Sequence, residues 1–153
     1  MTLVLAMGFT PMASAIDFTH DGVVDVFAAL AVAETTELDF GIVSDNDGTV
    51  TLNTSDTISS DPSGIHAGGT VATGDYTITG EASTTVAVTL TGSTAAGLTI
   101  GTFTTDQADL NNVPLGVGGS VVLAIGADLT VSAASASPGT NQTLSFTLGI
   151  TYN

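Results

Sequence analysis

Few side chains in this sequence could carry out catalysis. Histidine occurs only at His20, in FTHDG, and at His66, in GIHAGG, and histidine or a carboxylate with a shifted pKa usually acts as the general base near neutral pH. Asp39 and Glu81 could form the carboxylate pair of a glycoside hydrolase, but we expect both to be solvated or to cap turns. Cysteine is absent, which excludes a thiol nucleophile, a disulfide and a thiolate metal site. We therefore predict neither enzymatic activity nor a bound cofactor.

The segment DNDG at residues 45–48 is the sharpest candidate for a metal site. It places Asp45 and Asp47 two positions apart, as at the start of a calcium-binding loop. The glutamate that completes such a loop is missing. Asparagine, aspartate and glycine also adopt positive φ readily. We therefore interpret the segment as a hairpin turn leading into a strand over 49–53, with calcium at Asp45 and Asp47 as the weaker alternative.

The charge balance limits the partners of this chain. It has 15 acidic residues, no lysine and no arginine, so its formal net charge is −15. Nucleic acid is excluded as a partner because no side chain could neutralise phosphate, and adsorption to an anionic membrane is disfavoured for the same reason. Each carboxylate must instead be solvated, hydrogen-bonded or metal-bound.

Residues 1–15 have the pattern of a secretory signal peptide. A short apolar run over 3–9 is followed by a proline and by ASA at 13–15, so we expect cleavage after Ala15. A positively charged n-region is missing, so the natural start could lie upstream of Met1, and the alternative is a buried first strand. The run is too short to span a bilayer. We expect a secreted protein, extracellular or at the cell surface, whose mature chain does not insert into a membrane.

Beyond residue 16 the pattern indicates strands. In TTVAVTLT, residues 84–91, Val86, Val88 and Leu90 share one face and small residues occupy the other, which is the period of a half-buried strand. Turn formers separate such segments at a spacing typical of a sandwich. The predicted strands cover 23–32, 37–43, 49–53, 76–79, 84–91, 97–104, 120–125, 128–132 and 143–153. We predict one all-β domain over 16–153, an antiparallel β-sandwich.

The last predicted strand has the strictest alternation. Apolar side chains occupy its even positions, and small or polar residues lie between them. Because successive side chains of a strand point to opposite faces, the even positions should face the core, from a central or sheet-closing strand. These positions are Leu144, Phe146, Leu148, Ile150 and Tyr152.

Three segments occur in a recognisable order: ELDFGIV at 37–43, YTITGEASTTVAVTL at 76–90 and LTVSAASASPGTNQTLSFTLGITYN at 129–153. Together they resemble a family of bacterial secreted domains, domain of unknown function 4402, over residues 23–153. Thr140 stands where the family often has tyrosine after Pro-Gly, so one aromatic anchor is absent. The family has no established enzymatic activity. Its closing strand is similar to that of chaperone–usher pilins, so the resemblance implies an incomplete, immunoglobulin-like or pilin-like sandwich.

The segment 16–26 also has the period of a strand with one apolar face. Ile16, Phe18, Val24 and Val26 occupy even positions, and acidic or polar residues occupy most odd ones. The segment either folds back as the first strand of its own domain, or it acts as a donor strand that completes a second subunit by β-strand addition.

These observations predict a secreted structural protein. We expect a fimbria-like filament or cell-surface subunit that assembles with itself or with related subunits, because strand addition is a heterologous contact that does not close. The alternative is an extracellular β-sandwich module that binds a carbohydrate or another partner in a shaped site.

Overall fold

The computed structural model describes residue 19 and residues 21–136, 138–139 and 142–153. Regular structure in this part of the chain consists of strands, and no helix within it is long and apolar enough to cross a membrane. The strands are β1 (Ala31–Thr36), β2 (Ile42–Val43), β3 (Gly48–Leu52), β4 (Ile58–Ser60), β5 (His66–Gly68), β6 (Gly74–Thr79), β7 (Thr85–Thr91), β8 (Ser93–Ala95), β9 (Leu98–Thr105), β10 (Val113–Pro114), β11 (Ser120–Val131) and β12 (Thr147–Tyr152).

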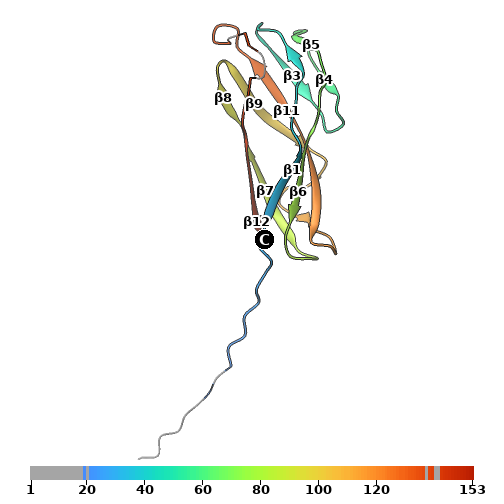
Figure 1. Cartoon of the computed structure of the whole chain (residues 1–153), viewed down its shortest axis with the longest axis vertical. Helices are drawn as coiled ribbons and strands as arrows, with labels where there is room; N and C mark the ends of the chain where they lie inside the picture. Colours follow the sequence, from blue (N-terminus) through green and yellow to red (C-terminus); the bar gives the residue numbers. More distant parts are fainter. Residues whose placement is uncertain (1–18, 20, 137, 140–141) are drawn as a thin grey trace, which may run out of the picture.

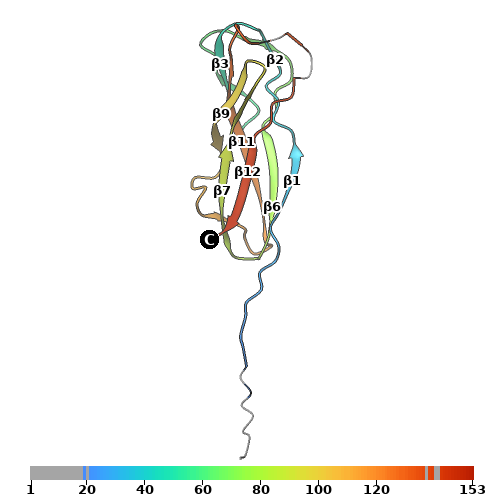
Figure 2. The same ribbon diagram turned by 90° about the vertical axis from the view of Figure 1, so that its left-hand side faces the viewer.

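Two antiparallel sheets pack against each other to form an elongated body (Figures 1 and 2). The larger sheet has the order β1-β6-β11-β3-β4, with β9 also paired to β11 and β8 to β9. The smaller sheet has the order β10-β7-β12. The short pair β2–β5 lies at one end of the body. The predicted all-β antiparallel sandwich is therefore confirmed.

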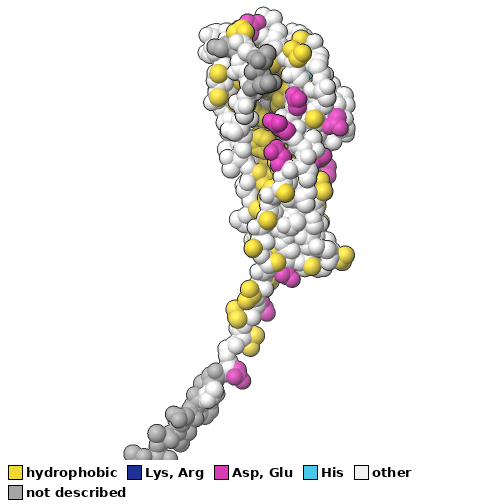
Figure 3. Space-filling view, in the orientation of Figure 1, with side chains coloured by type: hydrophobic (Ala, Val, Ile, Leu, Met, Phe, Trp, Pro, Cys, Tyr) yellow, Lys and Arg dark blue, Asp and Glu magenta, His cyan; other side chains and the backbone are white. Residues whose placement is uncertain are grey.

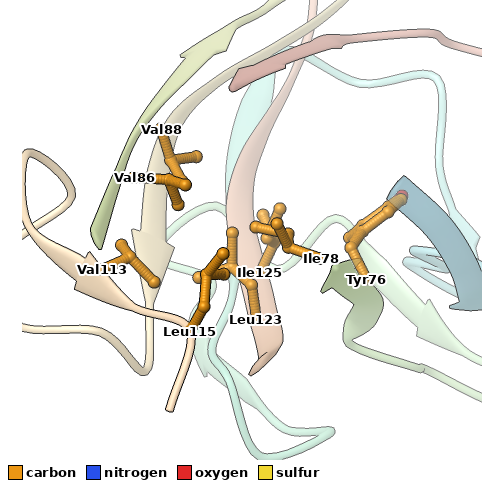
Figure 4. Close-up of a cluster of buried hydrophobic side chains, with 8 residues drawn as sticks. All are labelled: Tyr76, Ile78, Val86, Val88, Val113, Leu115, Leu123 and Ile125. Carbon is orange, nitrogen blue, oxygen red and sulfur yellow. The ribbon is translucent and has the colours of Figure 1, made fainter. Parts of the chain in front are cut away.

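The first core cluster fills the space between the two sheets. Side chains from β6 and β11 meet side chains from β7 and from the β10 segment, and Figure 4 shows them pointing toward one another. The cluster consists of Tyr76, Ile78, Val86, Val88, Val113, Leu115, Leu123 and Ile125. Burying each aliphatic side chain contributes about 1.5–3 kcal/mol, so this cluster is a main source of stability.

A second core cluster lies toward the β2–β5 end and consists of Val50, Ile65, Leu129 and Val131. The strand β11 joins the two clusters, because it supplies Leu123 and Ile125 to the first and Leu129 and Val131 to the second. Its first half pairs with β6 and its second half pairs with β3 and β9. The two predicted strands 120–125 and 128–132 are thus one continuous strand.

Three local predictions are wrong. Of the strand predicted over 37–43, only Ile42–Val43 form a strand. The strand predicted over 23–32 begins only at Ala31, and residues 21–30 belong to no strand. The predicted hairpin at 45–48 does not exist, because β2 pairs with β5 while β3 pairs with β4 and β11. Asp47 instead accepts a hydrogen bond from the Ala133 N–H at 2.7 Å, which ties the bend to the end of β11.

Candidate functional site

The strand β12 lies at an edge of the smaller sheet and leaves one side of its backbone unpaired. Within the described residues it pairs only with β7. Asn153 N–H donates to Thr85 O at 3.4 Å, so the odd residues face β7, and the even residues direct their N–H and C=O groups outward. We call these outward groups of Leu148 and Ile150 the open edge of β12. An unpaired edge is a template for another strand.

The side chains of the predicted closing strand take the expected side, but they are only half-buried. Leu148, Ile150, Tyr152 and Phe146 pack against the first core cluster, and Leu144 packs against the second. The strand itself begins at Thr147 and lies at the edge of its sheet. It is therefore not a central strand, because nothing in the described chain pairs with its outer side.

An apolar groove opens beside the segment that leads into β12. Its floor comes from Leu98 and Ile100 on β9 and from Leu129 and Val131 on β11. The residues 37–45 form one wall and 142–146 form another. Figure 3 shows apolar side chains between acidic ones in a hollow on this face. The groove and the open edge of β12 together offer apolar contact and backbone pairing.

The rim of this groove is acidic. Glu34, Glu37, Asp39 and Asp45 line it, and the chain contains no lysine or arginine that could neutralise them. Tyr76 also lines the groove and donates its hydroxyl to Glu34 Oε1 at 2.8 Å. Burial, the hydrogen bond to Glu34 and the nearby carboxylates raise the pKa of Tyr76 above its ordinary value. The groove therefore suits an apolar segment and repels an anionic one.

The carboxylates considered for glycoside hydrolysis do not meet. Asp39 pairs with Ala72, just before β6, and Glu81 follows the end of β6. Six residues of strand span roughly 20 Å, whereas a hydrolytic pair needs about 5–9.5 Å. Each carboxylate has a local role instead, since Asp39 Oδ1 accepts the Gly41 N–H at 2.8 Å and Glu81 Oε2 accepts the Ala28 N–H at 3.0 Å.

The remaining sequence candidates show no assembled chemistry. His66 lies on β5, and its Nε2 is buried with no hydrogen-bond partner among the residues that the structure describes. His20 lies outside the described residues. Asp45 lies on the groove rim and Asp47 holds Ala133, and the described part of the chain contains no group of three metal-ligating side chains. Calcium binding at Asp45 and Asp47 stays a prediction.

An extended arm, residues 21–30, leaves the sandwich beside β12 (Figure 1). Its apolar side chains are unusually accessible, with exposed fractions of 96% for Val23, 79% for Val24 and 83% for Val26. Val24 and Val26 are thus largely exposed to solvent. The other predicted donor residues, Ile16 and Phe18, and the predicted signal peptide 1–15 lie outside the described residues.

The root of the arm is held by a set of contacts that we call the root latch, formed by Phe27, Ala28, Glu81 and Tyr152. The Tyr152 hydroxyl donates to Ala28 O at 2.7 Å and accepts the Glu81 N–H at 2.5 Å. Glu81 Oε2 accepts the Ala28 N–H. The Phe27 and Tyr152 rings meet edge to face with centroids 5.1 Å apart. Both backbone groups of Ala28 are therefore bonded to the body.

Sequence reasoning missed the latch and most of the groove. The alternation over 143–153 predicts which face Tyr152 occupies, but it contains no signal for the partner of its hydroxyl. The groove lining comes from segments far apart in the chain, from 34 to 146, and only the fold brings them together. The alternation over 16–26 does place Val24 and Val26 on one apolar face, either of the domain's own first strand or of a donor strand.

Comparison with known protein families gives a match over most of the chain. The model of the family described as "Domain of unknown function (DUF4402)" matches residues 30–152. Neither a curated protein nor a solved structure gives a significant match to the chain. The family match covers most of the sequence and both sheets. The chain therefore belongs to the DUF4402 family, which confirms the resemblance drawn from its three segments.

Proposed function

We propose that this member of the DUF4402 family is a secreted structural protein, a subunit of a fimbria-like filament or of a cell-surface layer, assembled by β-strand addition. The observation that carries the proposal is the presence, in one chain, of an exposed apolar arm and of an open strand edge beside an apolar groove. We expect no enzymatic activity. The partner is a second copy of the chain or a related subunit.

The arm and the edge are complementary in length. Residues 21–26 precede the root latch, and six residues in extended form span roughly 20 Å. The strand β12 also has six residues. A second copy's arm could therefore pair with the whole of β12, which would satisfy its outward N–H and C=O groups and cover apolar side chains now in water.

The arm and the groove are also complementary in character. When Val24 and Val26 face the groove, Asp21 and Asp25 point to the opposite side, because strand side chains alternate. The acidic rim of the groove then meets no carboxylate from the inserted face. The contact is heterologous, since arm and groove are different surfaces, so repetition gives an open filament.

The sheet order supports an immunoglobulin-like, pilin-like reading of the sandwich. An immunoglobulin constant-type domain has one sheet of four strands and one of three, with the last strand beside the sixth. Here β1, β6, β11 and β9 correspond to the first sheet, because β6 and β9 pair with opposite sides of β11, and β7 and β12 correspond to two strands of the second. The place beside β12 is unfilled, and we propose that the donor strand occupies it.

The second candidate function is a binding module for a carbohydrate or another extracellular partner. The groove favours this reading in one respect, because Phe40, Tyr76 and Phe146 line it and aromatic rings are common in such sites. It would act as a monomer, with the groove open to the ligand.

Electron microscopy of the purified secreted chain tests the proposal. We expect fibres from the wild type, no fibres from Val24→Asp, and fibres from Val23→Asp. These two variants make the same change at neighbouring exposed positions, and only position 24 faces the groove in the proposed pairing. Deleting residues 16–26 should give an unstable or monomeric domain that the added peptide rescues.

Two results would contradict the filament. One is a wild-type chain that stays monodisperse and binds a glycan array, which favours the binding module. The other is equal assembly of Val23→Asp and Val24→Asp, which shows that the predicted face of the arm does not enter the groove. A well-folded deletion variant that is indifferent to the peptide also argues against the donor strand.

A further inference from the structure

We propose that the root latch prevents the arm from entering the groove of its own chain and thereby directs it to a second copy. This inference rests on the proposed function and adds a residue-level device to it. Tyr152 is the positioning residue, and Gly80 is the position that makes room for it. Three features hold the arm in its direction: the bonds at Ala28, the space at Gly80 and the lack of a turn-forming residue in the root.

The bonds at Ala28 fix the direction in which the arm leaves. Its C=O accepts the Tyr152 hydroxyl at 2.7 Å, and its N–H donates to Glu81 Oε2 at 3.0 Å. The same hydroxyl accepts the Glu81 N–H, so Tyr152 links the arm to the segment after β6. Reversal of the chain at this point would break both backbone bonds of Ala28 and the ring contact of Phe27 with Tyr152.

Gly80 leaves room for the latch. A Cβ atom at this position would lie 2.5 Å from the Tyr152 hydroxyl oxygen, 2.7 Å from Leu30 Cδ2 and 2.9 Å from Leu115 Cδ1. Gly80 is not among the residues with positive φ. The glycine is therefore required by close packing and not by backbone conformation. The absence of a side chain at Gly80 leaves room for the Tyr152 hydroxyl and for the side chain of Leu30, the last residue before β1.

The root itself has no residue that favours a turn. Its sequence from 27 to 31 is FAALA, and β1 begins at Ala31. Tight reversals usually need glycine, proline, asparagine or aspartate. Insertion into the chain's own groove requires such a reversal, because β1 and β12 already occupy the two sheet edges beside the root. The latch and the root sequence thus both oppose reversal of the arm toward its own groove.

The test measures the position of the arm within one chain. The sequence contains no cysteine, so Val24→Cys and Thr70→Cys, in the arm and on the groove, accept one spin label each. The labelled chain is diluted into excess unlabelled chain, and pulsed electron resonance gives the intramolecular distance. If the arm reversed at residue 28, residue 24 would move by roughly 25 Å, twice the length of four extended residues.

We expect a single long distance in the wild-type chain. Tyr152→Phe, which removes only the hydroxyl, and Gly80→Ala, which displaces it, should each add a population at shorter distance and slow fibre growth. Thr105→Val is the matched control, because it also removes a side-chain hydroxyl that donates to a backbone carbonyl, that of Gln107 at 3.0 Å, but Thr105 belongs neither to the latch nor to the groove lining. Circular dichroism checks that each variant is folded. If Gly80→Ala does not fold, Tyr152→Phe alone tests the latch.

The outcomes separate the latch from the filament. A short distance in the wild type, or an unchanged long distance in Tyr152→Phe and Gly80→Ala, overturns the latch. If the latch variants show the shorter label-to-label distance but the wild type forms no fibres, the latch is supported and the filament is contradicted. If fibres form and depend on Val24 while the latch variants behave as wild type, the filament stands and the latch fails.

Discussion

At the residue scale, backbone N–H groups take the place that basic side chains have in most proteins. Asp39 accepts the Gly41 N–H, Asp47 accepts the Ala133 N–H and Asp106 accepts the Ala124 N–H. Asp61 accepts two, from Ile65 and His66, each at 2.9 Å. Hydrogen bonds to the charged form of a carboxylate favour that form. The acidic residues thus organise loops although no lysine or arginine is present.

Asp61→Asn should lower stability at neutral pH and little at acidic pH. The hydrogen bond from the His66 N–H is the largest influence on the pKa of Asp61, and with those from Ile65 and Gly64 it outweighs desolvation and lowers the pKa. A group whose pKa is lower in the folded state stabilises the fold above its unfolded pKa of about 3.9. That contribution is lost as the pH falls through the folded pKa.

Urea unfolding at pH 7 and at several values below 4 checks this prediction. The difference in midpoint between wild type and Asp61→Asn should be largest at pH 7 and shrink in acid. Asp25→Asn is the control, because it removes the same charge from the exposed arm, and its midpoint should follow the wild type. A difference that stays constant with pH would show that the carboxylate charge at Asp61 is not involved.

At the element scale, the sequence predicted strands well wherever both neighbours of a strand lie within the chain. The alternation over 84–91 gave β7 and its buried face, since Val86 and Val88 are buried and Thr85 and Thr89 are exposed. Periodicity reports which face is apolar, but it cannot report whether a partner is present. The pattern therefore predicts a strand over 23–32, where residues 21–30 form an arm. It also leaves open whether β12 is a central or a sheet-closing strand, and β12 lies at the edge of its sheet.

The groove could not be predicted for a related physical reason. Its walls come from the segment after β1 and from the segment before β12. The alternation that includes Leu144 and Phe146 shows which face is apolar, but it does not show which distant segment lies opposite. The short β2 pairs with β5 and not with β3, so local turn chemistry at 45–48 gave the wrong neighbour. Tertiary pairing decided the position of these residues.

Phe146→Ala and Thr147→Ala should separate the two sides of the closing segment. Phe146 is half-buried and its ring lies 5.8 Å from that of Tyr76 and 5.1 Å from that of Phe103. A fully buried phenylalanine loses about 3–5 kcal/mol on truncation, so we expect roughly 2 kcal/mol here. Thr147 is exposed, and its truncation should cost less than about 0.5 kcal/mol.

Equilibrium unfolding of the two variants in denaturant measures this difference. Both changes remove atoms from adjacent positions, so they form a matched pair. Equal losses of unfolding free energy would mean that the side chain of Phe146 does not pack against the first core cluster. That result would also mean that residues 142–146 do not form a wall of the groove as described above.

At the scale of the whole molecule, one sign of charge covers an elongated body. The formal net charge is −15 with no cationic side chain except the histidines, so carboxylates repel one another on every face. Such self-repulsion keeps chains apart and disfavours the compact state. Assembly of copies must overcome the same repulsion, and the strand contact that we propose is short and apolar.

Sodium chloride should therefore raise the melting temperature. The Debye length falls from about 30 Å at 0.01 M to about 3 Å at 1 M salt, which screens the repulsion in the folded chain. Calorimetry across this range should show a rise of a few degrees, and potassium chloride should give the same curve. A melting temperature that does not change with salt would contradict the screening argument. Calcium at equal ionic strength should add stability only if Asp45 and Asp47 bind it.

The hydrogen bonds of the two tyrosine hydroxyls have a consequence for the fluorescence of the protein. The chain has no tryptophan and only Tyr76 and Tyr152, so its ultraviolet fluorescence comes from phenol rings. Tyr76 donates a hydrogen bond to the Glu34 carboxylate, and we expect this carboxylate to quench the excited ring by accepting the phenol proton in the excited state. Tyr152 is bonded to backbone groups. We therefore expect Tyr152 to dominate the emission of the unlabelled protein, so that the intensity and lifetime of this emission report on the root of the arm without any added dye.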